Sequence, residues 1–126
     1  MNRAVFVLLT YKTNNMIQTL NTSQAAHLLV SDEYAGWTYS GAHALVEYLE
    51  ELEEQIETPI EFDTVAIRCD YSEYKRAVEY ADQFAEFTNE IVEGETRGEN
   101  EARALEFLKD NTTVIEFEGG IIVQSF

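Results

Sequence analysis

Apolar residues recur along the chain with helical and with strand periods, so the sequence predicts both kinds of element. The clearest helical pattern begins at Ser40, the expected N-cap, and repeats apolar side chains on one face. That face consists of Leu45, Tyr48, Leu49, Leu52 and Ile56. Thr58 and Pro59 are expected to end the helix, because proline cannot continue it and disfavours helical geometry in the residue before it.

Three more segments have a helical pattern. A helix capped by Thr22 or Ser23 is predicted to run to about Val30, a second to span residues 72–87, and a third to span residues 101–109. The stretch 88–100 contains two glycines and four glutamates, so it is predicted to be a flexible loop.

Strands are predicted where β-branched and aromatic residues gather. These segments are 4–11, 16–20, 60–69, 113–117 and 121–126. The last two flank Glu118-Gly119-Gly120, which indicates a hairpin. The sequence thus predicts a single α+β domain over residues 1–126, with an antiparallel sheet of four to five strands, three to four helices mainly on one face and a C-terminal β-hairpin. Met16 is an alternative start, which would make residues 1–15 an accessory N-terminal strand.

Acidic residues occupy the other face of the 40–57 helix and continue past its end. Eight acids and no base lie between Ser40 and Asp63: Glu47, Glu50, Glu51, Glu53, Glu54, Glu57, Glu61 and Asp63. Like charges at this spacing repel by roughly 0.2–0.5 kcal/mol per pair, so local helix stability does not explain them. Six of them follow the helix at about one charge per 2.5–3 Å, against about 1.7 Å in duplex DNA. These eight acids are the candidate partner-binding residues; a solvated helix face is the alternative.

The charge of the whole chain limits its partners. Its formal net charge is −16, from 24 acids and 8 bases, and no Lys or Arg occurs from Thr13 through Ile67. The net charge of a small soluble domain usually has a magnitude of about 2–8. Direct binding of nucleic acid or of an anionic membrane is disfavoured, because both need a basic surface. The expected partners are cations, basic proteins or proteins that normally hold nucleic acid. Adaptation to high salt is a competing explanation, since only three lysines are present.

The residues that could carry catalysis form no convincing set, so the protein is predicted not to be an enzyme and to need no cofactor or metal. Cys69 has only His27 and His43 as potential partners for a nucleophile. His43 and Glu47 lie one turn apart and could share a metal with Asp63, but a second histidine at a suitable spacing is missing. Cys69 itself is expected to be a buried thiol at a strand end.

The single cysteine also predicts a reducing compartment, the cytosol. The longest apolar run, residues 4–9, is far shorter than the roughly 20 residues of a membrane-spanning helix, and no signal-peptide cleavage site follows it. Tyr34, Trp37 and Tyr39 are expected to cover the junction between two helices, with a recognition patch as the alternative.

Three segments resemble a group of small acidic proteins encoded by phages and other mobile elements. They are ALVEYLEELEE (44–54), EFDTVAIRCDYSEY (61–74) and TTVIEFEGGIIVQSF (112–126). The resemblance covers the chain from Met16 onward and implies an anti-defence factor, such as an anti-CRISPR or antirestriction protein that mimics DNA. Its implied partner is a basic nucleic-acid-binding protein or ribonucleoprotein complex of host defence. An interaction or regulatory module without mimicry is the alternative, and the hairpin edge is compatible with a homodimer.

Overall fold

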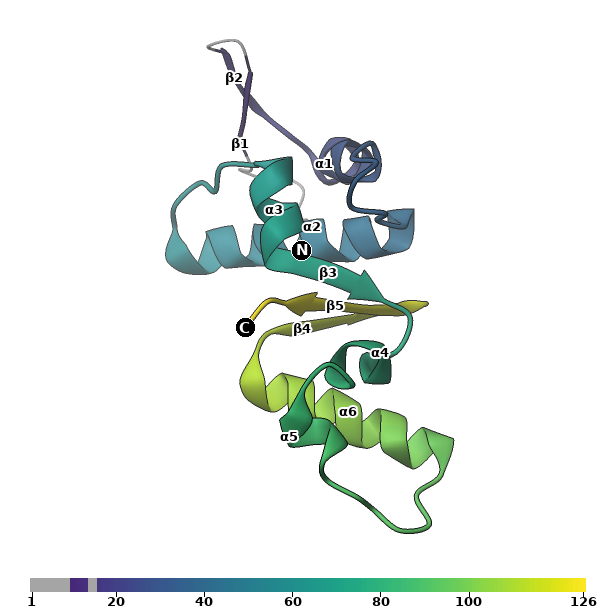
Figure 1. Ribbon diagram of the computed structural model, residues 1–126. Helices are drawn as coiled ribbons and strands as arrows, with labels where there is room; N and C mark the ends of the chain where they lie inside the picture. The colour runs from purple at the N-terminus through teal and green to yellow at the C-terminus, as the bar shows by residue number, and fades with distance from the viewer. Residues whose placement is uncertain (1–9, 14–15) are drawn as a thin grey trace.

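A three-stranded antiparallel sheet lies at the centre of the computed structural model, which describes residues 10–13 and 16–126 (Figure 1). Its strands are β3 (Tyr71–Tyr74), β4 (Val114–Phe117) and β5 (Gly120–Gln124), in the order β3-β5-β4. The three residues Ile121, Ile122 and Val123 are all buried. A run that is apolar on both faces is typical of a strand covered on both sides, which is the position of β5.

β4 and β5 form the C-terminal hairpin that the sequence predicts. Phe117 pairs with Gly120 across the turn Glu118-Gly119, and Gly119 has a φ of 112°, which favours glycine. Gly120 is required for another reason, because a Cβ atom there would collide with the carbonyl oxygen of Tyr74 on β3. The two glycines therefore shape the turn and allow the sheet to close.

Helices cover both faces of the sheet, so the prediction that they lie mainly on one face is wrong (Figure 1). Ile122 of β5 belongs to one core, whereas its neighbours Ile121 and Val123 belong to the other, as expected for side chains that alternate along a strand. The first core lies under the α2 layer, which consists of α1 (Thr22–Val30), α2 (Tyr39–Ile56) and α3 (Thr64–Asp70). The second lies under the α6 layer, which consists of α4 (Ala77–Ala81), α5 (Ala85–Thr88) and α6 (Arg97–Asn111).

Each helix of the α2 layer begins at a polar side chain that caps it. Asn21 accepts from the Gln24 N–H, Thr38 accepts from the Gly41 N–H, and the side chain of Asp63 caps α3. The caps predicted at 22 or 23 and at 40 therefore lie one or two residues too late. α2 ends at Ile56, ahead of Thr58 and Pro59 as predicted.

Two long segments have a different secondary structure from the one predicted. Residues 60–69, predicted as a strand, contain α3 instead, and residues 72–87, predicted as one helix, contain the end of β3 followed by α4 and α5. The predicted helix at 101–109 exists but begins four residues earlier, at Arg97, which shortens the predicted loop. The described part of the chain thus has six helices rather than three or four.

Within the described residues the other two strands form a second, separate sheet, so the prediction of one sheet of four to five strands is wrong. β1 (Thr10–Thr13) pairs antiparallel with β2 (Met16–Thr19), at the far end of the molecule from α6 (Figure 1). β2 confirms the strand predicted at 16–20. Most of the strand predicted at 4–11 lies outside the described residues.

Candidate partner-binding surface

Two of the eight acids proposed as partner-binding residues are buried in α2. Glu50 and Glu53 are 5% and 1% exposed. They continue the buried stripe of the helix, which contains Gly41, Ala42, Leu45, Val46 and Leu49. Ile56, predicted to be part of the apolar face, is 50% exposed. The buried face is therefore rotated from the predicted one, and the prediction that Glu50 and Glu53 face outward is wrong.

Both buried carboxylates connect α2 to neighbouring segments. The Thr22 hydroxyl at the start of α1 donates a hydrogen bond of 2.7 Å to Glu50 Oε2. The Ile60 N–H, which follows the end of α2, donates one of 2.6 Å to Glu53 Oε2. Hydrogen bonds to a charged group contribute about 1.5–3 kcal/mol. Glu50 and Glu53 therefore hold the α2 layer together, and they are not part of a binding surface.

The other six predicted acids are exposed. Four of them, Glu47, Glu51, Glu54 and Glu57, lie on α2 or at its end. Glu61 and Asp63 follow, and Asp63 Oδ1 accepts the N–H groups of Val65 and Ala66 at 3.0 and 3.1 Å. Asp63 therefore starts α3 as well as adding charge. The outward acids of α2 form the sequence-predicted part of the candidate surface.

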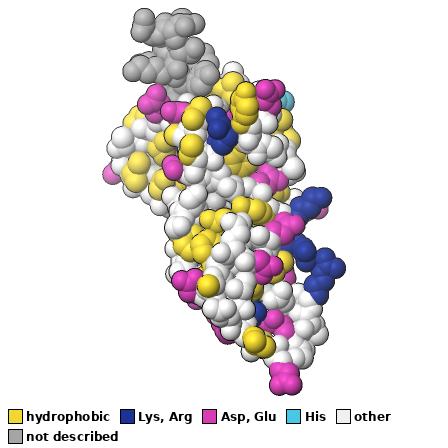
Figure 2. All heavy atoms as spheres, viewed as in Figure 1, with side chains coloured by type: hydrophobic (Ala, Val, Ile, Leu, Met, Phe, Trp, Pro, Cys, Tyr) yellow, Lys and Arg dark blue, Asp and Glu magenta, His cyan; other side chains and the backbone are white. Residues whose placement is uncertain are grey.

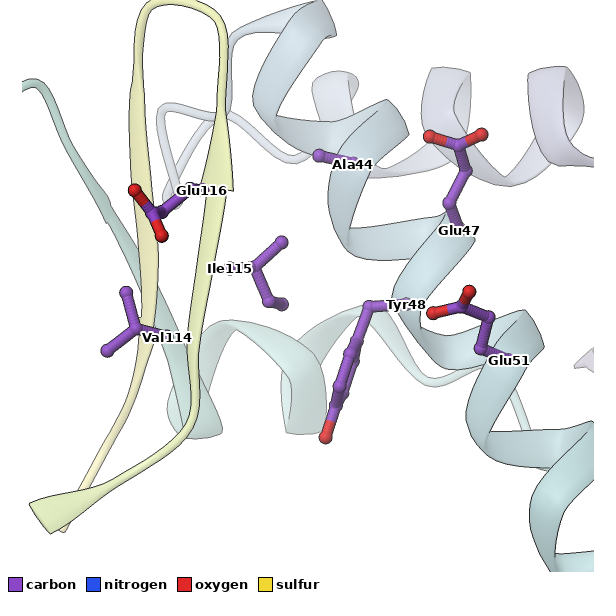
Figure 3. A pocket seen from close by; sticks show the side chains of 7 residues that line it. All are labelled: Ala44, Glu47, Tyr48, Glu51, Val114, Ile115 and Glu116. Atoms are coloured by element: carbon purple, nitrogen blue, oxygen red, sulfur yellow. The ribbon is translucent and has the colours of Figure 1, made fainter. Parts of the chain in front are cut away.

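A groove lies where α2 meets β4 (Figure 3). It has a volume of about 320 Å³, and we call it the acidic groove; it is lined by Ala44, Glu47, Tyr48, Glu51, Val114, Ile115 and Glu116. Figure 3 shows Ile115 pointing from β4 toward α2, and Glu47 and Glu51 projecting from successive turns of the helix. The groove thus combines the carboxylates of Glu47 and Glu51 with the apolar surface of Ile115, while Glu116 lines it from β4 with its side chain directed to the other side of the strand.

A second hollow of about 390 Å³ continues this surface toward the start of α2. It shares Ala44 and Glu47 with the acidic groove and adds Tyr39, Ser40, His43, Phe117 and Glu118. Glu116 and Glu118 were missed by sequence reasoning, because they are separated from α2 by about half of the chain. A local signal existed only in the alternating Glu116-Phe117-Glu118 of the hairpin.

A lysine and a histidine lie beside these carboxylates. Lys109 Nζ is 2.6 Å from Glu116 Oε2, and His43 Nδ1 is 3.4 Å from Glu47 Oε1. Exposed pairs of this kind contribute only about 0–1 kcal/mol, so a partner can replace them at little cost. Tyr71, whose ring lies 6.5 Å from that of Tyr48, keeps its phenol neutral, because burial raises its pKa and Tyr48 and Asp70 add to the effect.

Exposed acids are not confined to the α2 layer. Figure 2 shows Asp and Glu side chains over both helical layers, while most Lys and Arg side chains of that face lie along one side. The exposed acids of the α6 layer and its loop are Glu79, Asp82, Glu86, Glu90, Glu93, Glu99, Glu106 and Asp110. This layer also contains or adjoins five of the bases: Lys75, Arg76, Arg97, Arg103 and Lys109. The α2 layer differs, because residues 16–67, which include α1 and α2, contain many acids and no Lys or Arg.

The aromatic segment before α2 does not form one patch. Trp37 is 6% exposed and belongs to the core of the α2 layer, as predicted. Tyr34 is 79% exposed, with the guanidinium of Arg68 5.5 Å from its ring centre, and Tyr39 is half-exposed beside the rings of His27 and His43. A recognition patch made of all three rings is therefore not present.

The structure also places the residues that are candidates for catalysis or metal binding. Cys69 is exposed on α3, so the prediction of a buried thiol at a strand end is wrong. Within the described residues, no three His, Cys, Asp or Glu side chains are placed to hold a metal ion. No helix in the same part of the chain is long and apolar enough to cross a membrane.

Comparison of the chain with models of protein families, with curated proteins and with solved structures finds no match. The geometry and charge of the surface described above are therefore the basis for a functional proposal.

Proposed function

We propose that the protein is a non-enzymatic inhibitor of the phage anti-defence kind. It binds a basic nucleic-acid-binding effector of the host, a CRISPR complex or a restriction enzyme, and presents carboxylates where that effector normally holds phosphates. The observation that carries the proposal is the acidic groove, which is lined by exposed acids of α2 and of the hairpin (Figure 3).

The spacing of the exposed charges decides which elements have to take part. With Glu50 and Glu53 buried, four exposed glutamates remain over about 15 Å of α2, or about one per 5 Å. One strand of DNA carries a charge about every 3.4 Å. α2 alone is therefore sparser than a DNA strand, and Glu116 and Glu118 of the hairpin supply the additional charge beside it.

Binding of this kind depends on salt. Exposed charges more than a Debye length apart are largely screened, and that length falls from about 30 Å at 0.01 M salt to about 3 Å at 1 M. Each exposed contact contributes little, so affinity comes from many of them acting together. We expect capture of the effector in low salt and its release in high salt.

A second candidate function is an interaction or regulatory module whose acidity serves solubility or high-salt adaptation. The exposed acids of the α6 layer favour it, because acidity that serves solubility is expected on all sides of the molecule. In that case the position of a charge does not matter and only the total charge does. The two candidate functions therefore predict different results when the same charge reversal is made in the α2 layer and in the α6 layer.

Matched triple variants make this comparison. One carries Glu47→Lys, Glu51→Lys and Glu54→Lys in the α2 layer; the other carries Glu86→Lys, Glu93→Lys and Glu106→Lys in the α6 layer. All six acids are exposed, and each triple reversal changes the formal net charge of −16 to −10. Circular dichroism establishes that both variants are folded.

Each variant is immobilised and exposed to bacterial cytosolic extract in low and high salt, and bound proteins are identified by mass spectrometry. We expect the wild type and the α6-layer variant to recover a nuclease or guide-RNA complex in low salt, and the α2-layer variant to lose it. Equal loss from both folded variants would support the solubility alternative and contradict the proposal.

A further inference from the structure

β4 is the outer strand of the central sheet, and one of its edges has no strand beside it among the described residues. It pairs with β5 so that Ile115 lies opposite Ile122 and Phe117 opposite Gly120. One position earlier, the Gln124 N–H donates to the Thr113 carbonyl at 3.0 Å. Antiparallel pairs alternate between bonded and non-bonded positions, so the N–H and C=O groups of the even residues, Val114 and Glu116, point away from β5.

The acidic groove lies along this edge. It is lined by Val114, Ile115 and Glu116, which are consecutive in β4. Consecutive side chains of a strand point to opposite faces of the sheet, so a hollow that contacts all three opens on the edge of the strand and not on one face. Figure 3 shows this arrangement, with Ile115 directed toward α2 and Val114 and Glu116 directed to the other side of the strand.

The charge around the edge selects what can bind there. Glu47 and Glu51 stand on the α2 side, next to the apolar surface of Tyr48 and Ile115, whereas Glu116 lies on the other side of β4 beside Lys109. A second copy of this chain would bring the same carboxylates together in a molecule of net charge −16. Like charges facing each other across an interface cost affinity, so a cationic segment fits this edge and a second copy does not.

We infer that the free edge of β4 receives an extended segment of the partner as a fourth strand, with Arg or Lys at alternate positions. The backbone groups of Val114 and Glu116 bond to the segment, and its basic side chains on one face reach Glu47 and Glu51. The inference rests on the proposed function, from which it takes the basic charge of the partner. It adds that a segment of that partner binds as a β-strand.

Synthetic peptides test the backbone contact without changing the protein. The probe is a short capped peptide of alternating arginine and valine, labelled for fluorescence anisotropy. Two further peptides carry N-methyl groups on alternate residues, in opposite phase, because only one phase of amides faces β4. Losing two backbone hydrogen bonds predicts roughly tenfold weaker binding for one phase and little change for the other. Equal affinity of the two phases would overturn the inference.

Variants of Glu116 provide the second test. Glu116→Pro removes the outward N–H without breaking a bond to β5, and Glu116→Gln removes the charge but keeps the N–H. We expect Glu116→Pro to bind the alternating peptide several-fold more weakly than Glu116→Gln does, and the amide resonance of Val114 to shift on binding to the wild type. Equal affinity of two folded variants would contradict the inference; if Glu116→Pro does not fold, the methylated peptides decide.

The outcomes separate this inference from the proposed function. If the alternating peptide fails to bind while the nucleic-acid-binding effector is still captured from extract, the edge inference fails and the acidic surface stands. If the peptide binds at β4 but no nucleic-acid-binding protein is captured, the proposed function fails and the edge inference stands.

Discussion

Glu50 and Glu53 have the same side chain as the exposed acids around them but a different role. The carboxylate of Glu53 is buried and accepts the Ile60 N–H at 2.6 Å, whereas Glu54, the next residue, is exposed. Helix geometry explains the difference, because successive residues point about 100° apart around the axis. The acids of α2 therefore divide into residues that stabilise the fold and residues that charge the surface.

This division predicts effects of different size for two neighbouring substitutions. Glu53→Ala is expected to lower the free energy of unfolding by about 1–3 kcal/mol, because it removes a buried hydrogen bond and leaves the Ile60 N–H without that acceptor. Glu54→Ala is expected to change it by less than about 1 kcal/mol, because exposed charge interactions contribute little. Urea denaturation followed by circular dichroism measures both. Similar stability of the two variants would show that the Glu53 carboxylate is not needed for the fold.

At the scale of elements, α4 begins where a distant helix caps it. Glu101 of α6 accepts the N–H groups of Ala77 and Val78 at 2.6 and 3.0 Å. Glu79 also accepts the N–H groups of Lys75 and Arg76 there, but the bonds to Ala77 and Val78 come from a helix distant in the sequence, which the apolar pattern of residues 72–87 does not indicate. Long-range contacts of this kind set the boundary between β3 and α4.

Glu101→Ala is therefore expected to destabilise the α6 layer by about 1–2 kcal/mol, the usual cost of losing an N-cap. Glu106→Ala, an exposed position on the same helix, should stay within about 0.5 kcal/mol of the wild type. Thermal or chemical unfolding of both variants checks this prediction. An equal effect at the two positions would argue that α4 does not depend on the Glu101 carboxylate.

The start of α6 makes a prediction about pH. Glu99 accepts the Thr96 N–H at 2.9 Å, and this bond, with a smaller contribution from the Thr96 hydroxyl, holds the pKa of Glu99 below its ordinary value. A carboxyl whose pKa is lower in the folded than in the unfolded chain stabilises the fold above its unfolded pKa, and that stability is lost as pH falls through the folded pKa. Glu99→Gln should therefore be less stable than the wild type at neutral pH.

The difference between Glu99→Gln and the wild type should disappear in acid, where Glu99 is protonated in both states. Denaturation curves collected over a series of pH values provide the measurement. A stability difference that stays constant from neutral to acidic pH would contradict the assignment of the effect to the charge of Glu99.

Elements that depend on local pattern were predictable from the sequence, and elements that depend on distant contacts were not. The hairpin follows from Glu118-Gly119-Gly120, and α2 follows from its apolar stripe. By contrast, Val65 and Ile67 alternate as in a strand, but the Asp63 cap starts a short helix there. A helix of two turns shows too little periodicity to be recognised from apolar positions alone.

At the scale of the whole molecule, folding both removes and adds charges at the candidate surface. The sequence indicates the acidic side of α2, but it does not show that Glu50 and Glu53 turn inward, because the predicted apolar stripe omits Ala42 and Val46, which are buried. It also did not show that Glu116 and Glu118 would lie beside α2, because only packing of the hairpin against the helix brings them there. The acidic groove is thus a property of the tertiary structure.

Competition with nucleic acid tests the central claim most directly. The captured effector is titrated with the protein in the presence of its labelled duplex DNA or guide-paired target, in low salt. If the acidic surface takes the place of phosphates, the protein and the nucleic acid bind in mutually exclusive fashion, and the α2-layer triple variant fails to displace the nucleic acid while the α6-layer variant succeeds. A stable complex of effector, nucleic acid and protein together would contradict the account.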